Sequence, residues 1–367
     1  MKKKGTYKPA WTPANAGKEF AVNVVPGVDS RKNIHKKTET KINTKNLSVN
    51  DYAKGILKDD RNILARAITL IESNSPKHSE TAQEILKKIL PKTGKSIRIG
   101  ITGSPGVGKS TFIESLGNYL CERGHKVTVL AIDPSSSRTK GSILADKTRM
   151  EKLARQKNAF IRPTPSGGAL GGVARKTRET ILLCEAAGFD VILIETIGVG
   201  QSEIIVRSMV DFLMLLILPG GGDELQGLKK GTVELADAVV INKADGDNIV
   251  RANITLGEYK QAVHYLLPAT EGWTTNVFGA SAINDIGIEE IWSEVIKFRN
   301  TTKKTGVFEK RRKEQLLDWV YAMVEEELKH RFYENPKVSE IIPDIETKVL
   351  EGGMTASEAV KKLISKT

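Results

Sequence analysis

The sequence predicts an α/β protein with a mostly parallel, doubly wound sheet, flanked by an N-terminal and a C-terminal helical segment. Apolar residues make up 40% of the 367 residues, which is enough for a sizeable core. From residue 96 onwards, short and nearly continuous apolar runs alternate with helical patterns, as is typical of buried parallel strands joined by helices. The expected strands are Ile97–Thr102, Val127–Ile132, Val191–Ile194, Phe212–Leu218, Ala238–Ile241 and Val277–Ala280.

Helical signals precede and follow this region. Ser48 and Asp51 predict the start of a first helix, and Asp59–Asp60 can cap a second. A third helix ends at Pro91, because proline cannot continue the hydrogen-bond ladder. Near the C-terminus, apolar residues recur at helical spacing over Phe308–Phe332, which predicts a long amphipathic helix.

The charge distribution separates the first 46 residues from the rest. They hold ten Lys and one Arg against three acidic residues, so they supply eight of the twelve net positive charges. Because they lack apolar periodicity, we expect a disordered basic arm. The expected organisation is this arm at 1–46, a helical segment at 47–95, an α/β domain at 96–300 and a C-terminal helical segment at 301–367.

Composition excludes several classes of protein. No apolar run approaches the ~20 residues that span a bilayer, and the charged N-terminus lacks the apolar stretch of a secretory signal. Two cysteines, Cys121 and Cys184, are too few for a disulfide framework or a zinc site. We therefore expect a cytoplasmic protein without a membrane association.

A phosphate-binding loop is the strongest local signal. The pattern G-x-x-x-x-G-K-[ST] lies between the strand Ile97–Thr102 and an amphipathic helix, which is the context that this motif requires. Its glycines let backbone amides point at phosphates, and the helix N-terminus adds positive potential. Lys109 should reach the β- and γ-phosphates, and the Ser110 hydroxyl should bind Mg²⁺. The loop comprises Gly103, Ser104, Pro105, Gly106, Val107, Gly108, Lys109, Ser110 and Thr111.

A second motif indicates which base is bound. Asn242, Lys243 and Asp245 follow the strand Ala238–Ile241 in an N-K-x-D arrangement. The Asp carboxylate can accept hydrogen bonds from both guanine N–H groups, whereas adenine would leave it unpaired. Ser281-Ala282 follows the last strand and should contact the guanine oxygen through its backbone. The expected ligands are therefore GTP and GDP rather than ATP.

Three acidic residues are candidates for the metal end of the site. Asp133 and Glu195 close two predicted strands, so both lie at the carboxyl edge where parallel sheets bind ligands. Asp146 lies between them in the chain. Their oxygens, with that of Ser110, suit Mg²⁺. Gly198, three residues after Glu195, is placed to offer its amide to the γ-phosphate.

The residue after Gly198 weakens the expected hydrolytic centre. Val199 cannot orient an attacking water as a glutamine would, and Gln201 is only a weak substitute. We expect Lys109, Asp133, Glu195 and Gly198 to support slow hydrolysis of GTP in the absence of a partner. Turnover of tens per second by the isolated chain would contradict this expectation.

Longer motifs resemble a known family. The segments DPSSSRTKGSILADKTRM, ETIGVGQSE and PGGGDELQGLKKGTVELADAVVINKADGDN resemble the GTPase chaperones of adenosylcobalamin-dependent methylmalonyl-CoA mutase, long labelled lysine/arginine/ornithine transport-system ATPases. The resemblance covers about residues 47–367. It implies a SIMIBI-type P-loop GTPase that is homodimeric through its C-terminal helices. It also implies that the protein gates cofactor loading of the mutase and protects or reactivates that enzyme.

The resemblance further assigns three switch segments. Switch I surrounds Asp146, switch II covers 195–203, and switch III covers Gly220–Gly231 with Lys229 as its signalling residue. Lys140 and Ala145 replace glycines that are common in the family, which reduces backbone freedom in switch I.

Other functions are less favoured by the sequence. A transport-linked or metabolic P-loop ATPase or kinase would not need the guanine motif. A nickel-insertion GTPase would need clustered Cys and His residues, which are absent. Nucleic-acid binding by the basic arm is disfavoured, because charge runs are usually solvated.

Overall fold

The computed structural model describes residues 47–133, 150–165, 170–196, 202–220 and 230–366. Residues 47–367 form one compact unit. Within it lies a seven-stranded sheet, in which all strand pairs are parallel, with the order β3-β2-β4-β1-β5-β6-β7. The strands are β1 (Ile97–Gly103), β2 (Val127–Asp133), β3 (Ala159–Pro165), β4 (Val191–Glu195), β5 (Phe212–Ile217), β6 (Ala238–Ile241) and β7 (Asn276–Gly279).

Six of these strands agree with the sequence-based prediction to within one residue at either end, and the α/β fold class is confirmed. Strand β3 was not predicted. Its sequence, AFIRPTP, contains Arg162 and two prolines, which argue against a central strand. Among the described strands, β3 lies at the edge of the sheet and pairs only with β2, so proline costs no ladder hydrogen bond on its open side.

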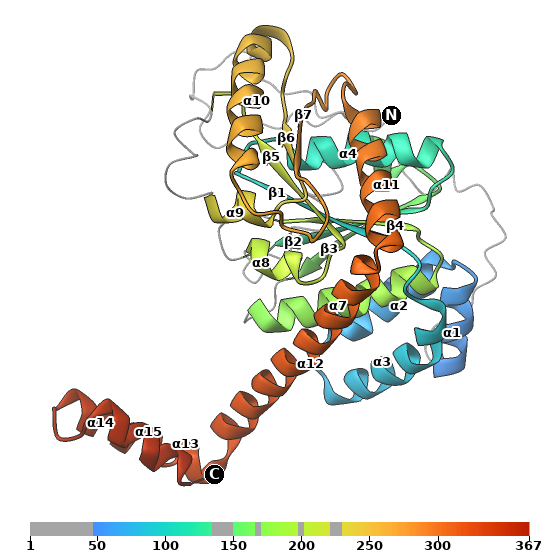
Figure 1. The fold of residues 1–367 in the computed structure, drawn as a ribbon. Coiled ribbons are helices and arrows are strands. Elements are labelled where there is room, and N and C mark those ends of the chain that lie inside the picture. The colour runs from blue at the N-terminus through green and yellow to red at the C-terminus, as the bar shows by residue number, and fades with distance from the viewer. Residues whose placement is uncertain (1–46, 134–149, 166–169, 197–201, 221–229, 367) are drawn as a thin grey trace, which may run out of the picture. The chain divides into compact units, whose positions relative to one another are not determined.

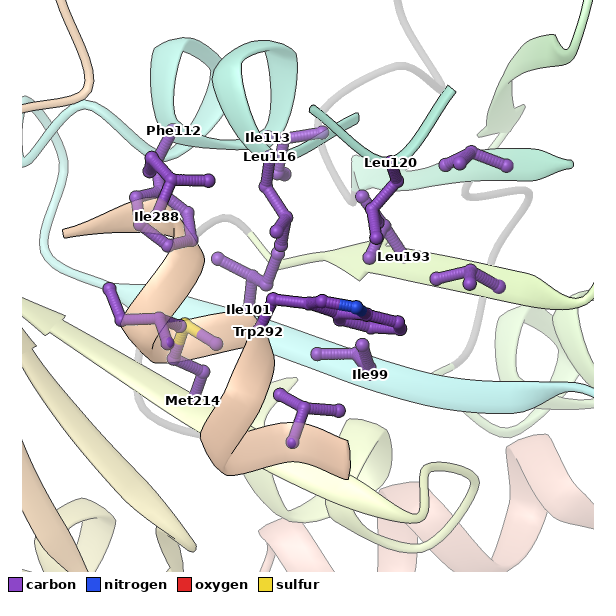
Figure 2. Close-up of a cluster of buried hydrophobic side chains, with 14 of the residues drawn as sticks. Ile99, Ile101, Phe112, Ile113, Leu116, Leu120, Leu193, Met214, Ile288 and Trp292 are labelled. Atoms are coloured by element: carbon purple, nitrogen blue, oxygen red, sulfur yellow. The ribbon is translucent and has the colours of Figure 1, made fainter. Parts of the chain in front are cut away.

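Helices cover both faces of the sheet (Figure 1). On one face, α4 (Lys109–Glu122), α6 (Glu151–Ala154) and α11 (Ile288–Lys304) bury one set of strand side chains. Figure 2 shows Trp292 of α11 beside Ile99 of β1 and Leu193 of β4 in this layer. The opposite face is covered by α7 (Leu170–Ala186), α8 (Ser202–Arg207), α9 (Lys230–Leu235) and α10 (Ile249–His264). The N-terminal helices α1 (Val49–Leu57), α2 (Arg61–Glu72) and α3 (Pro76–Ile89) pack on one another and on α7.

The N-terminal helices begin where their capping residues predict. The Ser48 hydroxyl accepts a hydrogen bond from the Asp51 amide, and the Asp51 carboxylate accepts one from the Ser48 amide. A complete capping box therefore starts α1. The carboxylate of Asp60 caps α2. Helix α3 begins at Pro76, because proline fits the first turn of a helix. A short 3₁₀ turn, η3 (Leu90–Lys92), follows α3, and a second one, η6 (Gly246–Asn248), precedes α10.

The C-terminal segment is helical throughout most of its length. The predicted amphipathic helix is α12 (Val307–Glu334), followed by α13 (Pro336–Ser339), α14 (Ile342–Leu350) and α15 (Ala356–Ile364). Among the described residues, every helix is too short or too polar to pass through a lipid bilayer.

Buried charges attach the start of α12 to the amino end of the sheet. The Arg312 guanidinium donates to both carboxylate oxygens of Asp211, at 2.7 and 2.6 Å, and to the carbonyls of Gly94 and Ser96. Burial disfavours the charged guanidinium, but the hydrogen bonds to Asp211 raise the pKa of Arg312 above its usual value. Gln315 donates to the carbonyls of Arg207 and Val210 just before β5.

The Asp211–Arg312 pair gives a stability prediction. Asp211→Ala removes a carboxylate that is 1% exposed and leaves the Arg312 charge without its partner. We expect a loss of about 3–5 kcal/mol in the free energy of unfolding, measured by urea denaturation. Arg331→Ala is the control, because its pair with Glu327 is largely solvent-exposed and its loss should leave the midpoint unchanged. Equal midpoints for all three proteins would contradict this account.

Candidate functional site

The phosphate loop leaves the carboxyl end of β1, the central strand. Gly106 and Gly108 have φ angles of 82° and 90°, which side-chain-bearing residues rarely adopt. Gly103 has no room for a side chain, because a Cβ there would lie 2.4 Å from the Leu216 carbonyl oxygen of β5. Val107 is fully buried and anchors the loop, whereas Pro105, Gly106 and Thr111 are exposed. The loop is therefore held in place by the buried Val107 side chain, while Pro105 and Gly106 are open to solvent.

Lys109 lies across its own loop. Its Nζ donates to the carbonyl of Gly103 at 2.8 Å and to that of Ser104 at 3.1 Å, and the residue is 8% exposed. An ammonium group in this place is close to where the β- and γ-phosphates of a bound nucleotide lie in P-loop proteins. The predicted role of Lys109 is therefore compatible with its position.

Two predicted metal ligands are in direct contact. The Ser110 hydroxyl donates to Glu195 Oε1 at 2.9 Å. Strand β4 brings Glu195 there, because its last residue pairs with Ile101 of β1 and with Ala131 of β2. In the described part of the chain, no group of three His, Cys, Asp or Glu side chains is arranged to hold a metal ion.

Other predicted residues of this end cannot be placed. The backbone of Asp133 ends β2 at the same edge of the sheet, but its side chain lies outside the described part. Outside the described residues altogether are Asp146, Gly198, Val199, Gln201, Lys140, Ala145 and Lys229.

The guanine motif is bonded to the phosphate loop. Asn242, which is 1% exposed, donates from Nδ2 to the Val107 carbonyl at 2.8 Å. Lys243 has a φ of 58°, and its Cε would lie 3.7 Å from a Cβ built on Gly108. The lysine stem therefore runs beside the loop, as expected for a side chain that covers a base.

The Asp245 carboxylate is held by the second predicted base-binding segment. The Ser281 hydroxyl donates to Asp245 Oδ2, and the Ala244 amide donates to the Ala280 carbonyl at 2.9 Å. Ser281 and Ala282 are both buried. The two segments thus form one rigid unit with the Asp245 carboxylate at its edge.

Two further contacts at the site were not predicted. The Ser115 hydroxyl of α4 donates to Asp285 Oδ1 at 2.5 Å, which ties the loop after Ser281 to the phosphate-loop helix. Glu203 of α8 accepts a hydrogen bond from Thr102, next to the phosphate loop. No sequence spacing indicates either contact, because the partners are about 100 or more residues apart.

The chain is similar to known proteins in both sequence and structure. A family model described as "Methylmalonyl Co-A mutase-associated GTPase MeaB" matches residues 64–337. The chain is 47% identical to "GTPase ArgK" of Escherichia coli over 75% of this chain and 83% of that protein. It is 45% identical to the mouse "Methylmalonic aciduria type A homolog, mitochondrial" over 84% of this chain and 77% of that protein. A crystal structure of an "LAO/AO transport system kinase" superposes with a TM-score of 0.71 and 36% identity, covering 86% of this chain and 96% of that one.

The predicted role of Asp245 in reading the base can be tested by changing the hydrogen-bonding pattern of its side chain. Asp245→Asn should weaken GTP binding about 10- to 100-fold, because the amide offers a donor where guanine also has donors. The same variant should gain affinity for xanthine nucleotides, which present an acceptor there. Competition between GTP and XTP for a fluorescent nucleotide measures both changes.

Asp247→Asn is the matched control for this experiment, since Asp247 is an exposed acid two residues away. It should bind GTP and XTP as the unaltered protein does. Unchanged GTP affinity in Asp245→Asn would show that Asp245 does not read the base.

Proposed function

The chain belongs to the methylmalonyl Co-A mutase-associated GTPase family, and we propose that it is the GTP-dependent chaperone of an adenosylcobalamin-dependent acyl-CoA mutase. It is a P-loop GTPase that binds guanine nucleotide and hydrolyses GTP. Methylmalonyl-CoA mutase is the first candidate as client. In this proposal the GTPase gates loading of adenosylcobalamin and protects or reactivates the mutase.

One observation carries the nucleotide part of the proposal. The Asn242–Val107 hydrogen bond joins the guanine motif to the phosphate loop, so one ligand can engage Asp245 and Lys109 together. GTP combines the base and the triphosphate that these two groups recognise. A transport-linked ATPase or kinase, which the name of the superposed crystal structure suggests for that protein, has no use for the Asp245 carboxylate.

Mg²⁺ completes the proposed site. The hydroxyl of Ser110 and the carboxylate of Glu195 are hard oxygen donors 2.9 Å apart, which suits this ion. We assign Ser110, Asp133, Asp146 and Glu195 to hold it, directly or through water. When bound, Mg²⁺ supplies positive charge to the β- and γ-phosphate oxygens. Lys109 adds a second positive charge, and the Gly198 amide binds the γ-phosphate.

The output of this cycle is conformational. We assign switch I to the segment around Asp146, switch II to 195–203 and switch III to 220–231. In this proposal the three segments respond to the γ-phosphate and relax after hydrolysis. Since Val199 cannot orient water, intrinsic hydrolysis is slow, and the GTP-bound form persists long enough to act on a client.

The C-terminal segment 301–367 is the proposed homodimerisation element. The α12 row (Leu317, Tyr321, Val324 and Leu328) follows the i, i+4, i+7, i+11 spacing of a helix seam, and each of its members is about half exposed or more. Such a row needs a partner surface, and a second copy of α12 presents the same row. The segments 47–95 and 96–300 then form the GTPase body of each subunit.

Other features complete the proposal. We place the protein in the cytoplasm, with no membrane partner. The basic arm 1–46 has no assigned role in the cycle, and nucleic acid is not among the proposed partners.

Client capture tests the chaperone proposal. Affinity-tagged protein loaded with a non-hydrolysable GTP analogue or with GDP should retain a cobalamin-dependent mutase from lysate of the native cell. The amount retained should differ between the two nucleotides, because the switch segments differ. Mass spectrometry of both eluates identifies the client. Absence of any such mutase from both eluates would remove the client while leaving the GTPase assignment.

The dimer prediction concerns α12 alone. Val324→Glu places a charge in the middle of the α12 row, so it should convert a dimer to a monomer in multi-angle light scattering. GTP turnover should continue, since Val324 is remote from the nucleotide residues. Glu325→Ala, one residue on and already polar, should remain dimeric. An unaltered protein with the mass of one chain would defeat the proposal directly.

A further inference from the structure

Glu203, the last residue of the proposed switch II segment, is a buried carboxylate beside the nucleotide site and has no role of its own in the proposal above. It lies in the first turn of α8 and is 5% exposed. Its Oε1 accepts from the Thr102 hydroxyl at 3.3 Å, and its Oε2 is buried with no hydrogen-bond partner among the described residues. Burying a carboxylate with so few hydrogen bonds is unfavourable, so its presence calls for a reason beyond stability.

The hydrogen bonds beyond Glu203 lead to the metal end of the site. Thr102 immediately precedes Gly103 of the phosphate loop, and Thr196 immediately follows Glu195. The Thr196 hydroxyl donates to Thr102 Oγ1 at 2.8 Å, and both threonines are buried. Each hydroxyl has one proton to donate. Because Thr102 donates its proton to Glu203, its oxygen is left to accept from Thr196. The carboxylate therefore sets the direction of both hydrogen bonds.

Helix α8 holds Glu203 firmly in this place. A Cβ on Gly100 of β1 would lie 2.7 Å from Val206 Cγ1, so α8 packs directly on the strand backbone. At the other end of α8, Arg207 forms an ion pair with Asp237 and donates to the Ala269 carbonyl at 3.1 Å. A helix fixed along its face and at its far end gives Glu203 a rigid support.

We propose that Glu203 is a positioning residue for the metal end of the site: through Thr102 and Thr196 it fixes the backbone that presents Glu195 to Ser110. The Thr196 amide also donates to the Ile101 carbonyl at 3.1 Å, so two contacts of Thr196 register this segment against β1. Without the carboxylate, the Thr102 hydroxyl can rotate and the side-chain contact is lost. This inference rests on the proposed Mg²⁺ role of Ser110 and Glu195.

The experiment compares full-length variants by their Mg²⁺ requirement. Glu203→Met keeps the side-chain volume and removes the acceptor. The Mg²⁺ concentration for half-maximal GTP turnover should rise about tenfold, in line with losses of outer-shell support at metal sites. The KM for GTP at saturating Mg²⁺ should stay within about twofold, because the base contacts are untouched. Mg²⁺-dependent slowing of fluorescent GDP release, a readout independent of turnover, should weaken in parallel.

Four other variants separate positioning from charge and from general damage. Glu203→Gln keeps an acceptor for Thr102, so its Mg²⁺ requirement should equal that of the unaltered protein. Thr102→Val should reproduce the Glu203→Met defect, and the double variant should be no worse than either single one. Glu294→Ala removes a buried carboxylate that binds Asn276 on the far edge of the sheet. It should lower thermal stability but leave the Mg²⁺ requirement unchanged.

Each remaining outcome contradicts a definite part of the proposal. A normal Mg²⁺ requirement in Glu203→Met overturns the positioning role. A Glu203→Gln defect as large as that of Glu203→Met, or additive effects with Thr102→Val, overturns the hydroxyl chain. If neither GDP release nor GTP turnover of the unaltered protein depends on Mg²⁺, the proposed metal site itself is refuted. If Glu203→Met does not fold, Glu203→Ala replaces it, with the same expectations.

Discussion

The amide of Asn242 is the contact on which the nucleotide site depends. It links two loops that are 135 residues apart, and it does so in a buried position where water cannot replace it. Loss of this bond would leave the Val107 carbonyl unpaired inside the protein, which is costly. The phosphate loop and the base-reading loop are therefore held as one frame, so the distance between triphosphate and base sites is built into the fold.

Strand order explains how the frame receives its two sets of side chains. β1 lies between β4 and β5 in the middle of the sheet. The phosphate loop therefore leaves the sheet with β4 and β2 on one side and β5, β6 and β7 on the other. On one side, β4 and β2 end at Glu195 and Asp133, the proposed metal residues. On the other side, β6 and β7 lead to Asn242 and Ser281, the proposed base-binding residues. Gly103 approaches the Leu216 carbonyl so closely that a side chain would not fit between them, and this packing holds the start of the phosphate loop against β5.

The sequence predicted the parts of this arrangement that local patterns encode. Apolar runs identified the central strands, and the Ser48 cap and the Lys109 loop identified helix starts, because each depends on neighbouring residues. Strand β3 was missed, since its prolines are tolerated only at an edge that no local pattern reveals. The contact of Glu203 with Thr102 was missed for a related reason. It arises from packing of α8 on β1, which depends on the whole sheet.

The two ends of the nucleotide site differ in the kind of bond that holds them. At the base end, backbone groups of Ala244 and Ala280 pair directly, and such a bond changes only if the chain moves. At the metal end, the support includes two side-chain hydrogen bonds, from Thr196 to Thr102 and from Thr102 to Glu203, and such bonds can break by rotation about one side-chain bond while the backbone stays in place. The proposed response to the phosphates therefore falls at the metal end, away from the proposed base contacts. That asymmetry suits the proposed cycle, in which the nucleotide stays bound while the switch segments respond to the γ-phosphate.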